Sequence, residues 1–216
     1  MSRTAGIEKI LRVMRAEAGN SAAVVSLRTP FQVLVSTVLS ARTRDENTAR
    51  ASAQLFSKFG TPSAIAGARL SEIGRLIKPS GFYKTKARNI KKLARELLER
   101  FDGEVPQGIE ALITLPGVGR KTANCVLVYA FGKPAIPVDV HVHRISNRLG
   151  LVETRAPEET EIALMKAVPK RHWIEINNLM VKFGQRVCRP VAPHCAQCGL
   201  MKDCNYGKLN VPSAHA

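Results

Sequence analysis

A glycine-rich turn between two helical patterns constrains the fold of this chain more than any other feature. The turn covers residues 115–122 (LPGVGRKT), between a short apolar helix pattern at residues 109–114 and a longer one at residues 120–131. We expect Gly117 and Gly119 to adopt backbone torsions that a side chain would forbid. The amide N–H groups at the start of the second helix would then face outward, an arrangement that binds phosphate without reading base sequence.

Lys121 stands in this turn at the start of the second helix, with Arg120 before it and Thr122 after it. The positive end of a helix dipole disfavours an ammonium group, and an amine that is uncharged part of the time can act as a nucleophile. Arg120 and Thr122 are candidate phosphate contacts beside it. For an isolated G-x-G turn, a surface lysine without a function would be the better interpretation, but the rest of the chain argues against it here.

Apolar residues recur at helical spacing almost throughout the chain, whereas no strand pattern and no internal repeat stands out. Thr29 and Thr61, each followed by proline, are typical N-cap signals, and Ser71 is a third candidate cap. The pattern predicts an all-α fold that ends in a cysteine-rich loop and a short polar tail. The longer predicted helices cover residues 31–39, 45–58, 83–101, 109–114, 120–131, 142–149, 158–168 and 171–183.

The charge balance is strongly basic, because 33 Lys and Arg against 17 Asp and Glu give a net charge of +16. Such an excess indicates a polyanionic partner, with nucleic acid as the first candidate, although a membrane-surface protein can be equally basic. No apolar run approaches the ~20 residues of a membrane span, and the first residues lack the apolar core of a signal peptide. We therefore expect an intracellular protein of the cytoplasm or nucleoid that is neither secreted nor bound to a membrane.

The helix predicted at residues 83–101 is strongly basic. Its charges could contact nucleic acid, but such runs are more often simply solvated. They belong to Lys84, Lys86, Arg88, Lys91, Lys92 and Arg95.

Four of the five cysteines, Cys188, Cys195, Cys198 and Cys204, fall within seventeen residues in the pattern C-x6-C-x2-C-x5-C. In a reducing compartment such crowding indicates metal ligation rather than disulfides. Zinc sites usually use two short ligand pairs, whereas four thiolates from one loop suit a 4Fe–4S cluster at least as well. His194, beside Cys195, is a rival ligand that keeps zinc possible, and the fifth cysteine, Cys125, lies in an apolar helix pattern as an expected core residue.

Asp139 stands at the start of a predicted helix, after a stiff connection at residues 132–137 (GKPAIP) that is the best domain boundary in the chain. It could be an ordinary N-cap, and a carboxylate in basic surroundings could also stabilise a developing cation or move protons. His141 and His143 are two residues apart and would point apart on a helix, so they cannot chelate one metal. We interpret them as structural or phosphate-facing.

The turn with its lysine, the Val-Asp-x-His segment at residues 138–141 and the four-cysteine loop together resemble the endonuclease III family of DNA glycosylases, within the helix–hairpin–helix superfamily. The resemblance runs from about Ile7 to Cys204, with eighteen residues from Lys121 to Asp139. It implies a six-helix barrel domain at residues 23–131 and a second domain that joins residues 1–22 to residues 132–216. The family's DNA-binding cleft lies between the two domains, and its four cysteines hold a 4Fe–4S cluster.

The resemblance implies a bifunctional DNA glycosylase and AP lyase of base excision repair that acts as a monomer on damaged double-stranded DNA. Lys121 matches the nucleophile that attacks the anomeric carbon and forms a Schiff base, and Asp139 matches its acid/base and electrostatic partner. The expected substrates are oxidised pyrimidines such as thymine glycol, which are extruded from the duplex before excision. Abasic sites should be nicked by β-elimination.

Other positions match the family's contacts with DNA. Asp45 matches an acidic residue at the mouth of the pocket, and Arg42 stands where bacterial members usually carry a glutamine that fills the gap left by the extruded base. Phe82 falls where the family places an apolar wedge, often leucine; it could stack between bases or instead pack under Tyr83 and Ile77. The residues around the cysteine loop that we expect to face DNA phosphate are Arg186, Arg189 and Lys202.

Three alternatives remain. An adenine-mismatch glycosylase of the same superfamily lacks a lysine at the position of Lys121, and a thymine-mismatch glycosylase typically has tyrosine there. A non-catalytic DNA-binding module would use the hairpin for backbone affinity alone. The presence of both Lys121 and Asp139 argues against that module.

Overall fold

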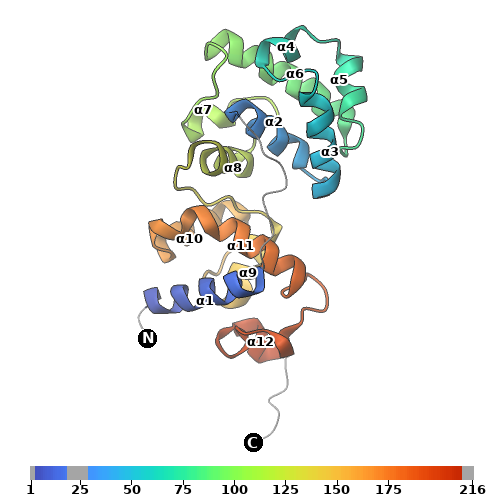
Figure 1. Cartoon of the computed structure of the whole chain (residues 1–216). Coiled ribbons are helices and arrows are strands. Elements are labelled where there is room, and N and C mark those ends of the chain that lie inside the picture. The colour runs from blue at the N-terminus through green and yellow to red at the C-terminus, as the bar shows by residue number, and fades with distance from the viewer. Residues whose placement is uncertain (1–2, 19–28, 211–216) are drawn as a thin grey trace, which may run out of the picture. The chain divides into compact units, whose positions relative to one another are not determined.

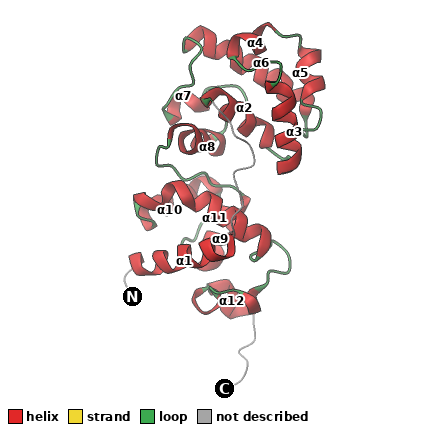
Figure 2. Cartoon of the chain, in the orientation of Figure 1, coloured by secondary structure: helices red, strands yellow, loops and turns green. Residues whose placement is uncertain are grey.

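The computed structural model describes residues 3–18 and 29–210, and every regular element in these ranges is helical (Figure 2). The all-α prediction is therefore confirmed. None of the described helices is long and apolar enough to cross a membrane. In chain order the α-helices are α1 (Arg3–Ala18), α2 (Pro30–Ser40), α3 (Asp45–Phe56), α4 (Pro62–Gly67), α5 (Leu70–Leu76), α6 (Tyr83–Arg100), α7 (Ile109–Ile113), α8 (Arg120–Phe131), α9 (Val140–Leu149), α10 (Pro157–Ala167), α11 (Trp173–Arg186) and α12 (Asn205–Asn210). Three short 3-10 helices are η1 (Lys170–His172), η2 (Cys195–Gln197) and η3 (Met201–Asp203).

The chain divides into two compact units. One is the continuous segment Ala22–Lys133, which contains α2 to α8, and the other joins Met1–Ser21 to Pro134–Ala216 and contains α1 and α9 to α12 (Figure 1). The passage from Lys133 to Pro134 lies in the proline-containing connection that follows α8.

In the unit Ala22–Lys133, α2 is the central helix, because seven of its eleven residues are buried. It packs against α3, α6 and α8. Thr29 caps it by accepting a hydrogen bond from the Gln32 amide at 3.2 Å, and Pro30 occupies its first turn. The same Thr-Pro signal starts α4, where Thr61 accepts from the Ala64 amide at 3.2 Å. Both predicted caps are confirmed.

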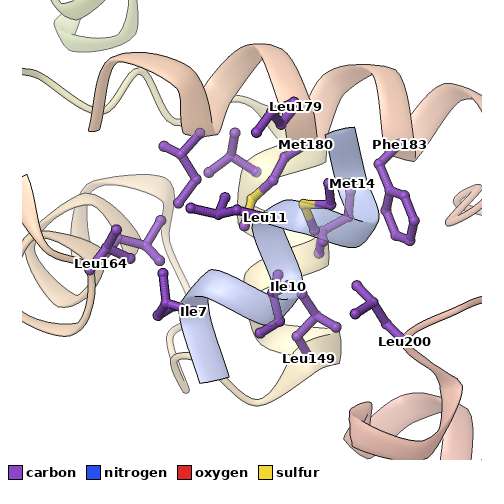
Figure 3. Packing of buried hydrophobic residues seen from close by; sticks show 14 of the residues in the cluster. Ile7, Ile10, Leu11, Met14, Leu149, Leu164, Leu179, Met180, Phe183 and Leu200 are labelled. Carbon is purple, nitrogen blue, oxygen red and sulfur yellow. The ribbon is translucent and has the colours of Figure 1, made fainter. Parts of the chain in front are cut away.

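The core of the other unit forms around α1 (Figure 3). Ile7, Ile10, Leu11 and Met14 are all buried, and their helical spacing places them on one face of α1. They pack with apolar residues of α9, α10 and α11, and Leu200 of the cysteine-rich loop joins the same cluster. The N-terminal helix is therefore an integral part of the unit that resumes at Pro134.

A polar network also ties α1 to this unit. The buried His172 hydrogen-bonds to Glu8 at 2.9 Å and to Glu175 at 2.7 Å, and Arg15 pairs with Glu175 at 2.6 Å. The Arg171 hydrogen bond lowers the pKa of Glu8; burial would raise the pKa of Glu175, but the bonds from Arg15 and His172 lower it. The network therefore makes its full contribution to the stability of the unit above about pH 4.3, where the carboxylates of the unfolded chain are ionised. This contribution is lost as acid protonates Glu8 and Glu175.

Two sequence predictions about the helices are wrong. Helix α5 begins at Leu70, because the Arg69 carbonyl already accepts from the Ile73 amide at 3.1 Å, so Ser71 is not its N-cap. In the expected polar tail, residues 205–210 instead form α12, which starts directly after Cys204, and the rest of the tail lies outside the described residues. The Cys204 carbonyl accepts from the Lys208 amide at 3.0 Å, and its sulfur accepts from the Gly207 amide at 3.3 Å. Anchoring by a buried cysteine gives this short segment the tertiary support that its own sequence does not supply.

Candidate active site and cysteine centre

The hairpin between α7 and α8 uses its two glycines differently. Gly117 has a φ of 79°, and a Cβ there would lie 3.0 Å from the Asn89 side-chain nitrogen, so both torsion and space require glycine. Gly119 has a φ of −92°, which any residue can adopt, and a Cβ there would meet nothing within 4 Å. The prediction of a forbidden torsion at Gly119 is therefore wrong. Its lack of a side chain instead leaves the first turn of α8 open to close approach.

The N-terminus of α8 carries the features of an anion site. Gly119 is the N-cap residue and provides no side-chain cap, and the first turn contains no acidic residue. Lys121 is half-buried in this turn, Arg120 is exposed, and Thr122 is buried, so position 122 can offer a ligand its amide but little of its side chain. The first amides of an α-helix have no partner within the helix itself, and a helix start therefore attracts anions.

Asp139 is the N-cap of α9, as expected. Its Oδ1 atom accepts hydrogen bonds from the amides of His141 and Val142, both at 2.9 Å. Within the described residues of its own unit, Oδ2 makes no hydrogen bond. One carboxylate oxygen therefore holds the helix start, while the lone pairs of the other are not used by this cap.

The two histidines of α9 have different partners, as their spacing predicted. His143 Nδ1 contacts the Thr160 hydroxyl at 2.7 Å, whereas His141 Nδ1 lies 3.1 Å from a guanidinium nitrogen of Arg144. A guanidinium can only donate, so His141 Nδ1 is the acceptor and the ring proton belongs on Nε2. A Cβ at Gly184 of α11 would lie 2.5 Å from His141 Nδ1, so that glycine makes room for the ring.

The structure brings Arg42 and Phe82 together. The Arg42 guanidinium carbon lies 5.9 Å from the centre of the Phe82 ring, and both residues have left-handed backbones, with φ of 52° and 57°. Phe82 is 64% exposed, which excludes the alternative that it packs under Tyr83 and Ile77. Asp45 is exposed at the first position of α3, three residues beyond Arg42.

Lys86 is a functional candidate that sequence reasoning missed. The charge run of α6 suggested a solvated side chain, but Lys86 is only 6% exposed. A signal was present, because Lys86 continues the buried stripe of Ile90, Leu93 and Leu97 at helical spacing. A lysine on an apolar face needs oxygen partners within the fold.

The four clustered cysteines line one shared cavity. All four are free, and Cys125 is buried in the other unit as expected. Backbone amides donate to two of the sulfurs, Leu200 to Cys198 at 3.4 Å and Gly207 to Cys204 at 3.3 Å. Within the described ranges, no group of three or more His, Cys, Asp or Glu residues is gathered closely enough to hold one metal ion.

Arg148 of α9 is a second missed residue, at the edge of this cavity. Its guanidinium donates to the carbonyls of Arg189 at 2.7 Å and Pro190 at 2.9 Å, lies 3.5 Å from Cys188 Sγ and stacks 4.2 Å from the Tyr206 ring. One cation thus fixes the loop that carries the first cysteine and lies close to its sulfur.

The basic residues around the cysteine loop are not equivalent. Arg186 is exposed and donates to the Glu17 carbonyl at 3.0 Å, which ties α11 to the end of α1. Arg189 and Lys202 are exposed side chains of the loop itself.

Burial raises the pKa values of the Cys195 and Cys198 thiols, and the neighbouring cysteines raise them further. Four thiolates in this loop would therefore need a positively charged partner.

Comparison with known proteins identifies the family. The model of the HhH-GPD superfamily of base excision DNA repair proteins matches residues 35–170. Endonuclease III of Thermotoga maritima is 54% identical over 177 residues, covering 82% of this chain and 83% of that protein. Endonuclease III of Synechocystis sp. is 40% identical over 209 residues, covering 96% and 92%.

Solved structures agree. A trapped endonuclease III–DNA covalent intermediate has a TM-score of 0.89 at 38% identity, covering 97% of this chain and 98% of that one. A thermostable thymine-DNA glycosylase has a TM-score of 0.83 at 27% identity, covering 95% and 99%. The chain therefore belongs to the endonuclease III family of the HhH-GPD superfamily, and is a base excision repair glycosylase with AP lyase activity. The mismatch-glycosylase and non-catalytic alternatives are not favoured.

The two hairpin glycines provide a matched pair of variants. We expect Gly117→Ala to destabilise the protein by about 1–3 kcal/mol, because alanine is strained at positive φ and its Cβ would press on Asn89. Gly119→Ala should cost less than about 1 kcal/mol, mainly through a poorer N-cap. Urea unfolding curves of the two variants measure the difference. Equal destabilisation would contradict the structure of this hairpin.

Proposed function

We propose that this chain, acting as a monomer, excises oxidised pyrimidines from duplex DNA with Lys121 as nucleophile and then nicks the strand. The observation that carries this proposal is the start of α8, where Lys121 lies in a first turn that has neither a side-chain cap nor an acidic residue. The amides of this turn would hold a DNA phosphate while the amine reacts. The similarity to a trapped endonuclease III–DNA covalent intermediate supports a covalent mechanism.

The neutral Lys121 amine would attack the anomeric carbon of the damaged nucleotide, and the bond from that carbon to the base would break, with its electron pair leaving on the base. Opening of the sugar ring then gives a Schiff base between Nζ and the carbon. The cationic Schiff base acidifies the adjacent sugar hydrogen, and loss of that proton expels the 3′ phosphate by β-elimination. Hydrolysis of the Schiff base returns free Lys121 and leaves an unsaturated aldehyde end.

Asp139 is proposed as the acid/base and electrostatic residue of this reaction. Its Oδ1 atom is committed to the amides of α9, and Oδ2 would stabilise the developing positive charge and move the protons. The cap bonds hold the carboxylate in one orientation, which suits a group that must act at a fixed position.

The remaining assigned residues would bind the DNA. The amides around Gly117 and Gly119, with Arg120, would grip the backbone, and the exposed Phe82 and Arg42 would enter the duplex where the damaged nucleotide leaves it. Further proposed contacts come from Asp45, Thr122, His141, Arg186 and Arg189. The unit Ala22–Lys133 would thus be the helix–hairpin–helix domain, and the other unit the cluster domain.

We propose that Cys188, Cys195, Cys198 and Cys204 bind a 4Fe–4S cluster. Four thiols from one loop share one cavity, and a 4Fe–4S cluster is ligated by four thiolates. Amide hydrogen bonds to sulfur are the kind that tune such clusters. With a thiolate on every iron, the cluster would cross-link the loop and leave no open coordination position for catalysis.

We expect Lys121→Ala to abolish excision of thymine glycol and strand cleavage while leaving duplex binding within about threefold, because only the nucleophile is removed. Borohydride trapping on thymine glycol and abasic duplexes measures the adduct directly, with Lys133→Ala as the control. An adduct formed by the alanine variant would show that another amine is the nucleophile. Wild-type activity confined to 8-oxoguanine or a G·T mismatch would overturn the lesion assignment.

We expect Asp139→Asn to lower the single-turnover excision rate at least ~10²-fold, because it removes the negative charge and the proton acceptor. Asparagine is itself a good N-cap, so the melting temperature should hardly change. Asp139→Ala removes the cap as well and should cost a further ~0.5–2 kcal/mol of stability. Near-normal excision by the asparagine variant would reduce Asp139 to a structural cap.

We expect anaerobically purified protein to be yellow-brown and to contain about four iron and four sulfide per chain. Cys198→Ser should lose most of this iron, whereas Cys125→Ser should keep it, because Cys125 lies in the other unit. Elemental analysis and visible absorption measure both. Colourless protein with one equivalent of zinc would refute the cluster assignment.

A further inference from the structure

The Lys86 ammonium is surrounded by four oxygens. Its Nζ atom lies 2.7 Å from the Leu39 carbonyl, 2.6 Å from the Ala41 carbonyl, 2.9 Å from the Thr43 hydroxyl and 2.8 Å from the Ser80 hydroxyl. Burial lowers its pKa to about 8, so at neutral pH most molecules still carry the charge. A buried ammonium group with this many oxygen partners has a structural role, because its hydrogen bonds must offset the cost of its burial.

These oxygens belong to two segments that are far apart in the sequence. Leu39, Ala41 and Thr43 lie at and after the end of α2, and Ser80 lies in the turn before α6. The segments are also joined directly, because the Gly81 amide donates to the Thr43 hydroxyl at 3.1 Å and Ser80 donates to the Leu39 carbonyl at 3.0 Å. Lys86 closes this network from inside α6.

A strained residue lies within the first segment and another directly follows the second. Arg42 follows Ala41, Phe82 follows Gly81, and both have a left-handed backbone, which costs a residue with a side chain on the order of 1–2 kcal/mol. Such conformations persist only where the surroundings fix them. A Cβ at Gly81 would lie 3.0 Å from the Arg42 carbonyl oxygen, so the two backbones already touch.

Lys86 also supplies what the end of α2 lacks. The last carbonyls of a helix have no partner within the helix and carry its negative dipole end. Helix α2 has no basic residue in its last turn. The ammonium from α6 therefore satisfies Leu39 and Ala41 and fixes the direction in which the chain leaves α2 toward Arg42.

We propose that Lys86 is a positioning residue for lesion recognition, which locks Arg42 and Phe82 into one rigid two-pronged wedge. The inference rests on the proposed entry of these two residues into the duplex. A rigid wedge matters when the damaged base is still stacked and paired, since the wedge must replace its contacts as it leaves. It matters little for a lesion that is already unpaired. Lys86 thus determines how well the enzyme acts on lesions inside intact duplex.

The test compares Lys86→Met with Lys91→Met, a matched control on the same helix whose lysine also donates to a backbone carbonyl, that of Ala68. Each protein is given thymine glycol paired with adenine and the same lesion in an unpaired bubble. We expect Lys86→Met to slow excision from the paired site by about 10- to 100-fold, the scale of a misplaced catalytic element, and to change the bubble rate less than about threefold. The control should change both rates alike, and Lys86→Arg, which keeps the charge, should restore part of the paired-site rate.

Epistasis with Phe82 completes the test. In a Phe82→Ala background, Lys86→Met should have a clearly smaller further selective effect, because only the Arg42 prong is left for it to position. An equal loss on both substrates, or a full additional loss in the double variant, would overturn the inference. If Phe82→Ala alone leaves paired-site excision unchanged, the wedge assignment itself is wrong, and borohydride trapping at Lys121 still tests the proposed chemistry separately. Should Lys86→Met fail to fold, Ser80→Ala removes one partner of the same network and must show the same selectivity in milder form.

Discussion

The unsatisfied backbone groups at helix ends are the constraint on which this structure depends. A fold made of many short helices has many such ends, and each must find a partner or a ligand. Asp139 completes the start of α9, and the Lys86 ammonium completes the end of α2. The start of α8 has no side-chain cap. It also has no acidic residue in its first turn and a glycine as its N-cap, so an anion from outside the chain can approach the helix start closely.

The positive charge of the chain is divided between structural and surface roles. Lys86 and Arg148 donate hydrogen bonds to carbonyl, hydroxyl and sulfur partners within the fold. Arg144 is partly buried and donates to the Cys188 carbonyl at 2.9 Å. These residues contribute to the net charge of +16 but cannot each neutralise a phosphate. The salt dependence of DNA binding should follow the exposed cations alone, which are fewer than the sequence count suggests.

Most of the features that could be predicted from the sequence depend on interactions between residues that are close in the chain. The Thr-Pro signals placed the starts of α2 and α4, and Asp139 was expected as a cap, because capping involves neighbours along the chain. Lys86 was missed because its partners lie up to 47 residues away, and Arg148 because it acts on a loop 40 residues later. Helix α12 was missed for the same reason, since its support comes from Cys204 and the core around it. The torsion of Gly119 was mispredicted because this glycine is the N-cap of α8 and has an extended backbone that any residue can adopt.

At Arg42 and Phe82, the interactions that hold the strained backbones also make the two residues rigid. A flexible wedge would follow any duplex and could not distinguish a well-stacked base from a poorly stacked one, because its own adjustment would absorb the difference. Holding two left-handed residues in place requires interactions that are already made before DNA arrives, and the Lys86 network provides them. A rigid wedge offers the same contacts whichever base leaves, so bases that stack weakly, such as ring-saturated pyrimidines, leave the helix most easily. On this view a buried lysine that never touches DNA contributes to the choice of lesion through the stiffness of the residues that do.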